Sequence, residues 1–150
     1  MRIAIVQMTS TGEVAENLAV ARAFVGEAAD AGAELVALPE NFAWLRREGT
    51  GIPCAQGLDG EIVATLRELA ARHRIWLLGG TFPEAAPDGE RVYNTSLALA
   101  PDGRIAARYR KIHLFDVDLS GQGGLVYRES DRIAPGDAPV RVDTPFGGIG

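Results

Sequence analysis

Short apolar runs alternate with helical patterns in the first half of the chain. The runs at residues 3–6, 35–38 and 75–78 are rich in Ile, Leu and Val, and each has the length of a buried strand. Between them, apolar residues recur at the spacing of an amphipathic helix. The first helix, which we expect to end near Gly32, has Val14, Leu18, Ala21, Val25 and Ala28; the second, with Asp59 as N-cap, has Ile62, Leu66 and Leu69. This β-α-β order predicts strands packed under helices.

The pattern changes after the third apolar run. Pro87-Asp88-Gly89 and Pro101-Asp102-Gly103 are turn sequences, and strand-like runs at 92–99 and 104–110 flank them. Asp-Gly between extended segments indicates β-hairpins. The sheet is therefore predicted to be mixed, with βα units first and antiparallel strands later.

Two long segments show no clear pattern. Residues 41–58 and 112–138 are predicted to be irregular, and a loop as long as the second is usually functional. Beyond them, we expect a short strand at 140–142, a turn at 144–148 and the start of another strand at 149–150.

Composition excludes several classes of function. The chain has 150 residues, enough for one domain with a sizeable core, and a net charge of −5. It lacks the basic patch of a nucleic-acid binder, the ~18 apolar residues of a membrane span and the features of a signal peptide. Its one cysteine, Cys54, rules out an internal disulfide framework. We therefore expect a cytoplasmic protein with no nucleic-acid or membrane partner.

Two charged residues follow predicted strands. Glu40 comes after the run 35–38, at the carboxyl end of a strand, where α/β sheets often carry function. A partly buried carboxylate there can act as a general base, although position alone favours a surface glutamate. Lys111 follows an alternating strand, and an ammonium shielded from water stabilises a developing oxyanion. The alternative is a surface lysine with its stem on the sheet.

The remaining candidates are weaker when taken singly. Glu129 is interpreted as a solvated loop charge, His113 as a structural hydrogen-bonding group, and His73 as a charge partner at a helix C-terminus. Cys54 has no base nearby in sequence and no helix N-terminus to lower its pKa, which favours a non-catalytic thiol. No Cys/His spacing is typical of a zinc site.

Several short segments share their order with a known family. They span essentially the whole chain and are Ile3–Gln7, Ala33–Glu40, Leu78–Gly80, Val92–Thr95, Pro101–Gly103, Tyr109–Asp116 and Thr144–Gly147. In this order they resemble the nitrilase superfamily of carbon–nitrogen hydrolases. Each segment is weak alone, but together they form a strong signal, which favours the functional interpretations of Glu40 and Lys111.

The resemblance implies a four-layer α-β-β-α sandwich with a mixed sheet. It also implies a Glu–Lys–Cys catalytic set, in which Glu40 matches the general base and Lys111 matches the group that holds the tetrahedral oxyanion. Glu129 matches the second glutamate of the family, which positions the substrate and the other catalytic side chains. A thioester forms on the cysteine and water releases the acid. No metal or organic cofactor is implied.

One part of the family pattern is missing from these residues. The family nucleophile follows the Thr144–Gly147 segment, and Cys54 does not match its position. We therefore expect residues 1–150 to be an incomplete carbon–nitrogen hydrolase domain, truncated on the C-terminal side, and to lack amidase activity by themselves. Missing strands would leave exposed sheet edges and apolar faces.

The segment around Lys111 favours one branch of the superfamily. Lys111–Asp118, followed by Gly121-Gln122-Gly123, resembles the amidases of small α-keto acid amides, namely the ω-amidases and the deaminated-glutathione amidases. The expected substrate is a small carboxylated amide, and the expected assembly is a homodimer or a higher homo-oligomer. Two alternatives stay open. One is a catalytically inactive nitrilase-like binding or assembly module, and the other is an enzyme that acts on nitriles.

Overall fold

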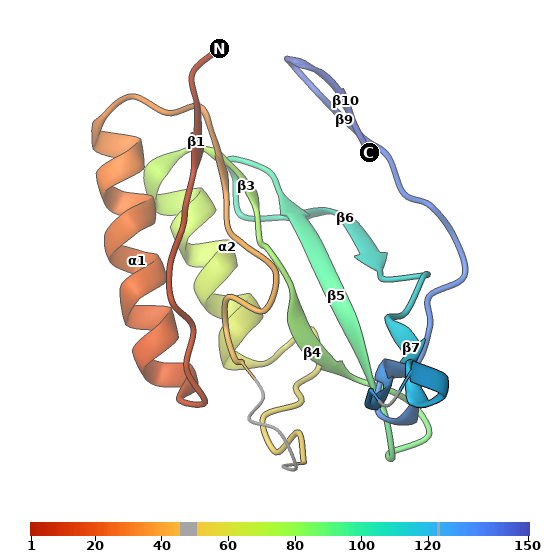
Figure 1. Ribbon diagram of the computed structural model, residues 1–150. Coiled ribbons are helices and arrows are strands. Elements are labelled where there is room, and N and C mark those ends of the chain that lie inside the picture. Colours follow the sequence, from red (N-terminus) through yellow and green to blue (C-terminus); the bar gives the residue numbers. More distant parts are fainter. Residues whose placement is uncertain (46–50, 123) are drawn as a thin grey trace.

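The first half of the chain alternates strands and helices, and its strands form a parallel sheet (Figure 1). The computed structural model describes residues 1–45, 51–122 and 124–150. Three strands pair in parallel and in chain order: β1 (Ile3–Ile5), β2 (Leu35–Ala37) and β3 (Trp76–Leu78). Two helices connect them: α1 (Val14–Asp30) and α2 (Glu61–His73). None of the described helices is long and apolar enough to cross a membrane.

The later strands make the sheet mixed, as predicted. They are β4 (Phe82–Ala85), β5 (Val92–Leu99) and β6 (Ile105–Arg110). β5 is central, because β3 and β4 pair with successive parts of one edge and β6 pairs antiparallel with the other. Both predicted hairpins are confirmed. In their turns, Asp88 accepts the N–H of Arg91 and Asp102 accepts the N–H of Arg104, each at 3.0 Å.

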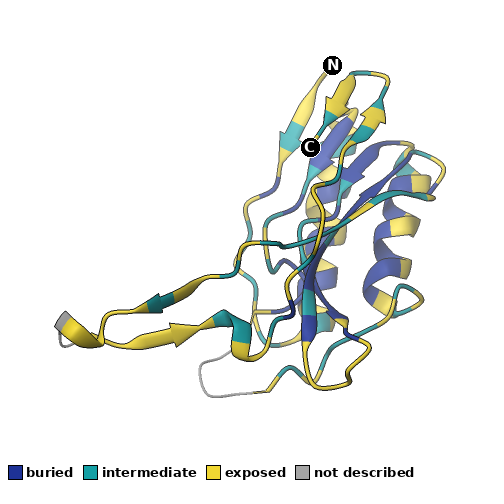
Figure 2. Cartoon of the chain, turned by 90° about the vertical axis from the view of Figure 1, so that its right-hand side faces the viewer, coloured by how far each residue is buried: buried dark blue, intermediate teal, exposed yellow. Residues whose placement is uncertain are grey.

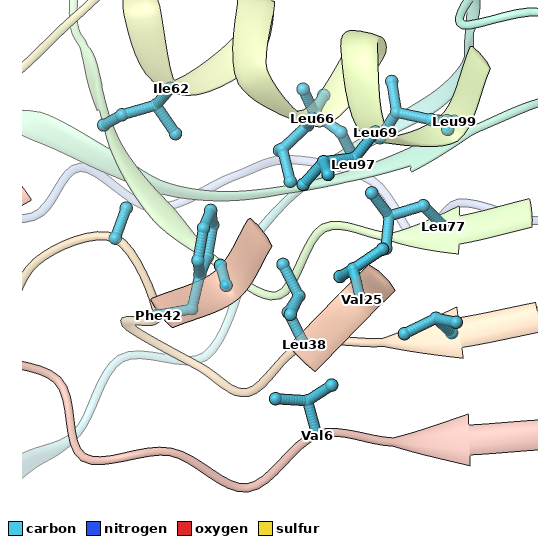
Figure 3. Packing of buried hydrophobic residues seen from close by; sticks show 14 of the residues in the cluster. Val6, Val25, Leu38, Phe42, Ile62, Leu66, Leu69, Leu77, Leu97 and Leu99 are labelled. Atoms are coloured by element: carbon cyan, nitrogen blue, oxygen red, sulfur yellow. The ribbon is translucent and has the colours of Figure 1, made fainter. Parts of the chain in front are cut away.

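The main hydrophobic core lies between the two helices and one face of the sheet (Figure 3). Val25 from α1 and Leu66 from α2 meet Leu77 and Leu97 from the sheet, and all four are almost fully buried. Burial of a side chain of this size stabilises a fold by about 1.5–3 kcal/mol. The predicted apolar stripes are confirmed, since every one of their residues lies in or against this core: Val14, Leu18, Ala21, Val25, Ala28, Ile62, Leu66 and Leu69.

The first strand is buried on one face only. Ala4 and Val6 pack in or against the core, but Ile3 and Ile5 point to the other face and are 49% and 84% exposed. The prediction of a buried strand at residues 3–6 is therefore wrong for half of its side chains. Alternation along a strand puts neighbouring residues on opposite faces, and a short run of apolar residues does not show which face is covered.

The sheet face away from the helices is covered in part by a hairpin. This hairpin consists of β9 (Val142–Thr144) and β10 (Gly147–Ile149), so the expected strand at 140–142 begins two residues late. Val142, Phe146 and Ile149 pack there against a small buried cluster of Leu35, Trp76 and Ala100.

Residues 112–138 are more regular than predicted. Strands β7 (Asp116–Asp118) and β8 (Val126–Arg128) form an antiparallel hairpin that projects from the body (Figure 2). Each is followed by a short 3-10 helix, η1 (Ser120–Gln122) or η2 (Glu129–Asp131). Each strand has only three residues and buries neither face, so it is too short for apolar alternation to reveal it. Residue 123 of the Gly-Gln-Gly segment, and residues 46–50 of the predicted loop at 41–58, lie outside the described residues.

The N-terminus of α2 differs from the prediction. Gly60, not Asp59, is the N-cap residue, and no side chain of the cap accepts a hydrogen bond. Instead, the Gln56 side-chain oxygen accepts the N–H of Ile62 at 3.1 Å. A residue upstream of the helix thus satisfies a free N–H of the first turn, which the usual sequence rule for caps does not detect.

A glycine bend between β3 and β4 holds the loop that follows β2. Gly80 has a φ of +52°, and a Cβ atom on it would overlap the carbonyl oxygen of Pro39. Thr81 then binds the same loop twice. Its N–H donates to the Pro39 carbonyl at 3.3 Å, and its hydroxyl accepts the N–H of Asn41 at 2.8 Å. The bend therefore fixes the backbone on both sides of Glu40.

Substitution Gly80→Ala tests this close approach. We expect it to lower the free energy of unfolding by about 3 kcal/mol or more, because overlap with Pro39 adds to the cost of a left-handed φ. The control is Gly89→Ala, where φ is +71° but a Cβ atom would meet nothing within 4 Å. Only the conformational cost, about 1 kcal/mol, applies there. Denaturant unfolding compares the two variants. Equal losses of unfolding free energy would contradict the close approach of Gly80 to Pro39.

Candidate active site

Glu40 lies in the turn after β2, at the carboxyl end of the strand. The N–H of Leu38 donates to the Leu78 carbonyl at 2.9 Å, which extends the pairing of β2 with β3 up to this turn. Beyond it, the contacts of Thr81 hold the backbone. The Glu40 side chain is nevertheless 55% exposed. Its carboxylate is thus anchored at the backbone and accessible at the tip.

Lys111 is the first residue after β6. Its N–H donates to the carbonyl of Asn94 at 2.9 Å, and its own carbonyl accepts the N–H of Gly136 at 2.8 Å. Both backbone groups are occupied, which restricts the direction of the side chain. Lys111 is also the only lysine in the sequence. A compact ammonium with three donors differs in geometry from the planar guanidinium of arginine, so the residue type at this position matters.

The Lys111 ammonium lies between two carboxylates. Its Nζ is 3.5 Å from Glu40 Oε1 and 3.1 Å from Glu129 Oε2. Glu129 begins η2 directly after β8, and its Oε2 also accepts the N–H of Phe115 at 2.6 Å. The structure therefore brings together all three predicted site residues, which come from three elements far apart in the sequence.

Burial and charge have opposite effects on Lys111. Desolvation is the largest single effect and lowers its pKa, but the hydrogen bond from Nζ to Glu129 and the attraction of Glu40 and Glu129 together outweigh it, so the pKa of Lys111 is raised. The side chain is therefore a protonated ammonium across the neutral range. Such a group can donate hydrogen bonds to a developing negative charge without first gaining a proton.

A cavity of about 390 Å³ adjoins the site at Glu129. Asn94 and Glu129 form part of its wall, whereas Glu40 and Lys111 are not part of it. Among the described residues that line the cavity, Glu129 and Arg132 are the charged ones. Glu129 is paired with Lys111, but Arg132 makes no ion pair within the described part of the chain. The volume suits a small molecule, and Arg132 gives its wall a positive charge.

The residue pattern of the whole chain matches a known family. The family model described as carbon-nitrogen hydrolase covers residues 2–150. The chain belongs to the carbon–nitrogen hydrolase family.

Relatives in this family include omega-amidases. The chain is 37% identical to omega-amidase NIT2 of Homo sapiens over 149 residues, which cover 99% of this chain and 52% of that protein. It is 38% identical to omega-amidase NIT2 of Danio rerio, with the same coverage of both proteins. The chain thus spans about half the length of the curated relatives it matches.

Solved structures of nitrilase-superfamily members share the fold. The C. elegans NitFhit protein matches with a TM-score of 0.85 and 34% identity, over 97% of this chain and 35% of that chain. Nit3 of Saccharomyces cerevisiae, a member of branch 10 of the nitrilase superfamily, matches with a TM-score of 0.75 and 27% identity, over 97% and 52%. The predicted α/β fold of the nitrilase superfamily is confirmed.

The sequence interpretation of this member of the carbon–nitrogen hydrolase family missed Asn94. Asn94 lies in β5 and is buried, and its Nδ2 donates to Glu40 Oε1 at 2.8 Å. The available signal was the residue type itself, because asparagine is depleted in strands and seldom buried. The segment Val92–Thr95 carried the family resemblance, but no role followed for Asn94 from the pattern alone.

A second charged cluster lies on the other face of β5 and β6. Glu84 is buried, and its carboxylate accepts hydrogen bonds from Arg110 at 2.6 and 3.1 Å and from the Thr95 hydroxyl at 2.7 Å. Because side chains alternate along a strand, Arg110 and Lys111 point to opposite faces. The Glu84–Arg110 pair therefore fixes the end of β6 from which Lys111 extends. Burial raises the pKa of Glu84, but the bonds and charges of Arg110 and its neighbours outweigh this effect and the pKa is lowered.

Two sequence candidates lie outside the site. Cys54 does not line the cavity, and burial raises the pKa of its thiol, which makes it a poorer nucleophile. His113 is exposed, and its side chain makes no hydrogen bond to another described residue, so the prediction of a structural hydrogen-bonding histidine is wrong. The described residues contain no group of three or more His, Cys, Asp or Glu that could hold a metal ion.

Substitution Glu84→Gln tests the second cluster through the pH dependence of stability. We expect a loss of about 3–5 kcal/mol at neutral pH, because the Arg110 charge loses its buried partner. Folding lowers the pKa of Glu84, so its ionised form stabilises the protein above the ordinary glutamate pKa of about 4.3, and this contribution is lost as the pH falls through the lowered value.

Urea unfolding over a range of pH measures the effect. The difference between parent and Glu84→Gln should be largest at neutral pH and should shrink in acid, where a protonated glutamate resembles glutamine. The control is Asp143→Asn, which removes the exposed ion pair with Arg141 and should cost less than about 1 kcal/mol. A Glu84→Gln loss that does not change with pH would contradict the assignment.

Proposed function

We propose that the intact protein hydrolyses the C–N bond of a small amide by a Glu–Lys–Cys mechanism. The observation that carries the proposal is the Lys111 ammonium, which lies 3.5 Å from the Glu40 carboxylate and 3.1 Å from that of Glu129. Membership of the carbon–nitrogen hydrolase family and the omega-amidase relatives support hydrolysis of an amide. We assign the nucleophile to a cysteine outside residues 1–150, because the family pattern expects it after Thr144–Gly147.

Each group has a defined role in the proposed reaction. Glu40 takes the proton of the thiol, and the thiolate forms a C–S bond with the amide carbon while the carbonyl electron pair moves to oxygen. Lys111 donates to that oxyanion. The C–N bond then breaks, and the nitrogen takes the proton from Glu40 and leaves as ammonia. Water, deprotonated by Glu40, attacks the thioester, which releases the acid and restores the thiol.

Glu129 acts in this proposal by holding Lys111. Its carboxylate is fixed by the N–H of Phe115, and it lies closer to Nζ than Glu40 does. The ammonium thus keeps both its position and its proton when Glu40 changes charge during the reaction. The raised pKa of Lys111 supports this division of roles, since an oxyanion stabiliser must not give up its proton.

We propose a small carboxylated amide as the substrate, of the ω-amidase or deaminated-glutathione amidase class. Support comes from Arg132, which lines the cavity without an ion-pair partner among the described residues. Its N–H donates to the Glu129 carbonyl and its carbonyl accepts the N–H of Val92, so its backbone is fixed beside the site. A guanidinium can bind a carboxylate with two hydrogen bonds. A substrate with an amide at one end and a carboxylate at the other would use both Lys111 and Arg132.

The other functions considered from the sequence have less support. An inactive binding or assembly module does not require an ammonium between two carboxylates, and no observation here favours a nitrile over an amide. We further propose a cytoplasmic protein that forms a homodimer or a larger homo-oligomer, in line with the family resemblance.

Substitution Lys111→Met in the intact protein tests the proposed reaction. We expect kcat for a small ω-amide to fall by about 10³-fold or more, because the oxyanion loses its charged donor. Lys111→Arg keeps the charge but not the compact ammonium, and we expect it to fail to restore kcat. Circular dichroism and thermal unfolding check that both variants fold. Parental kcat in Lys111→Met would refute the assignment.

Substitution Arg132→Gln tests the substrate class. We expect KM for a carboxylated amide to rise by about 10-fold or more, with little change for a neutral amide of similar size, because a charge-assisted pair is lost only with the first. Arg141→Gln is the control, since Arg141 lies directly before β9, does not line the cavity and is 72% exposed. Equal losses on the two substrates would count against Arg132 as the carboxylate contact.

A further inference from the structure

Asn94 is hydrogen-bonded to both Glu40 and Lys111. Its backbone carbonyl accepts the N–H of Lys111 at 2.9 Å, and its side-chain Nδ2 donates to Glu40 Oε1 at 2.8 Å. Through these two bonds, one residue of the central strand sets the position of a group after β2 relative to a group after β6.

The chemistry of the contact fixes the orientation of the Asn94 amide. A carboxylate only accepts hydrogen bonds, so the NH₂ group must face Glu40 and Oδ1 must point away. Oδ1 is buried, and it is the only buried side-chain nitrogen or oxygen among the described residues that lacks a hydrogen-bond partner. A buried acceptor without a partner costs about 1–3 kcal/mol, so an apolar residue would suit the fold alone better. The contact to Glu40 offers a reason for asparagine at this position.

The contact also makes the two oxygens of Glu40 different. Oε1 accepts from Asn94 at 2.8 Å and lies 3.5 Å from Lys111 Nζ. Oε2 makes no hydrogen bond or ion pair to another described residue. The Glu40 side chain is 55% exposed, so solvent or a substrate group can reach this oxygen. One oxygen is therefore occupied by donors and the other is available to accept a proton.

Without Asn94, Glu40 would have a different best partner. Its carboxylate would be free to rotate toward Lys111, whose Nζ is 3.1 Å from Glu129 but 3.5 Å from Glu40. A closer Glu40–Lys111 pair would occupy the base and the oxyanion donor with each other. Asn94 satisfies Oε1 from the strand side and so favours the more open arrangement.

We infer that Asn94 is a positioning residue that holds Glu40 Oε1 and thereby presents Oε2 as the atom that takes the proton from the nucleophile. The inference rests on the proposed hydrolase function. Within the described part of the chain, two other charged groups act near Glu40: Lys111 from the end of β6, and Glu129 from η2 through its contact with Lys111. The Glu84–Arg110 pair lies on the opposite strand face and does not contact it.

The experiment uses Asn94→Asp in the intact protein, a change that conserves shape. It replaces the donor to Glu40 with a second carboxylate, and two carboxylates at this distance hold a shared proton to higher pH. Because the base must be ionised, we expect the acidic limb of the kcat–pH profile to move up by about one pH unit or more. At neutral pH, kcat should fall by at most about 10-fold. KM should stay within about threefold, since substrate contacts are unchanged.

Asn17→Asp is the matched control. Asn17 is as buried as Asn94 but lies in α1, where Nδ2 donates to the carbonyls of Thr11 and Ala43 at 2.8 and 2.9 Å. Asn17→Asp should have a lower melting temperature than the parent. At temperatures where it stays folded, its kcat–pH profile should match that of the parent. Asn94→Ser is a second variant, too short to reach Glu40, which should lower kcat at unchanged KM even if Asn94→Asp does not fold.

The outcomes separate the two hypotheses. If the parent is active, two results would each overturn the role of Asn94 alone. One is an unchanged kcat–pH profile in Asn94→Asp, and the other is an unchanged kcat in Asn94→Ser. A parent without amidase activity would overturn the proposed function and this inference with it. A shift of the acidic limb in Asn94→Asp that is absent from Asn17→Asp would support the inference, because a purely structural role would not move it.

Discussion

The position of the Lys111 ammonium between the carboxylates of Glu40 and Glu129 is the interaction on which the site depends. Each member comes from the end of a different strand: β2, β6 and β8. Neither carboxylate is near Lys111 in sequence, so the contact exists only when the six-stranded sheet and the β7–β8 hairpin are both formed. The charges also depend on one another, since the two carboxylates raise the pKa of the lysine against the effect of burial.

β5 provides the common reference for these groups. It pairs directly with β6, which leads into Lys111, and with β3 and β4. The bend at Gly80 between β3 and β4 lies against the loop that carries Glu40. An error in the register of either edge by one residue would turn the side chains to the wrong face. The hydrogen bonds of Asn94 to both residues make this dependence explicit, because they link the two edges at a single point.

Features with a local cause could be predicted from the sequence. The two Asp-Gly hairpins follow from turn chemistry, and the helices follow from apolar periodicity. The convergence of Glu40 and Lys111 came from the family resemblance, because no local pattern specifies a contact between residues so far apart. The β7–β8 hairpin was missed because each of its strands has three residues and buries neither face, which is too short for alternation to be recognised. Asn94 and Arg132 were missed because their roles depend on neighbours that only the folded chain supplies.

The adjacent cations Arg110 and Lys111 separate two requirements of the molecule. Arg110 points to one face of β6, where Nε and Nη2 of its guanidinium donate to the carboxylate of buried Glu84. Lys111 points to the other face, where Glu40 is largely exposed and Glu129 adjoins the cavity. The alternation of a single strand thus places a structural cation and a candidate catalytic cation on opposite sides of the sheet. It follows that the buried pair can hold the end of β6 rigid while the neighbouring ammonium stays accessible to a developing charge.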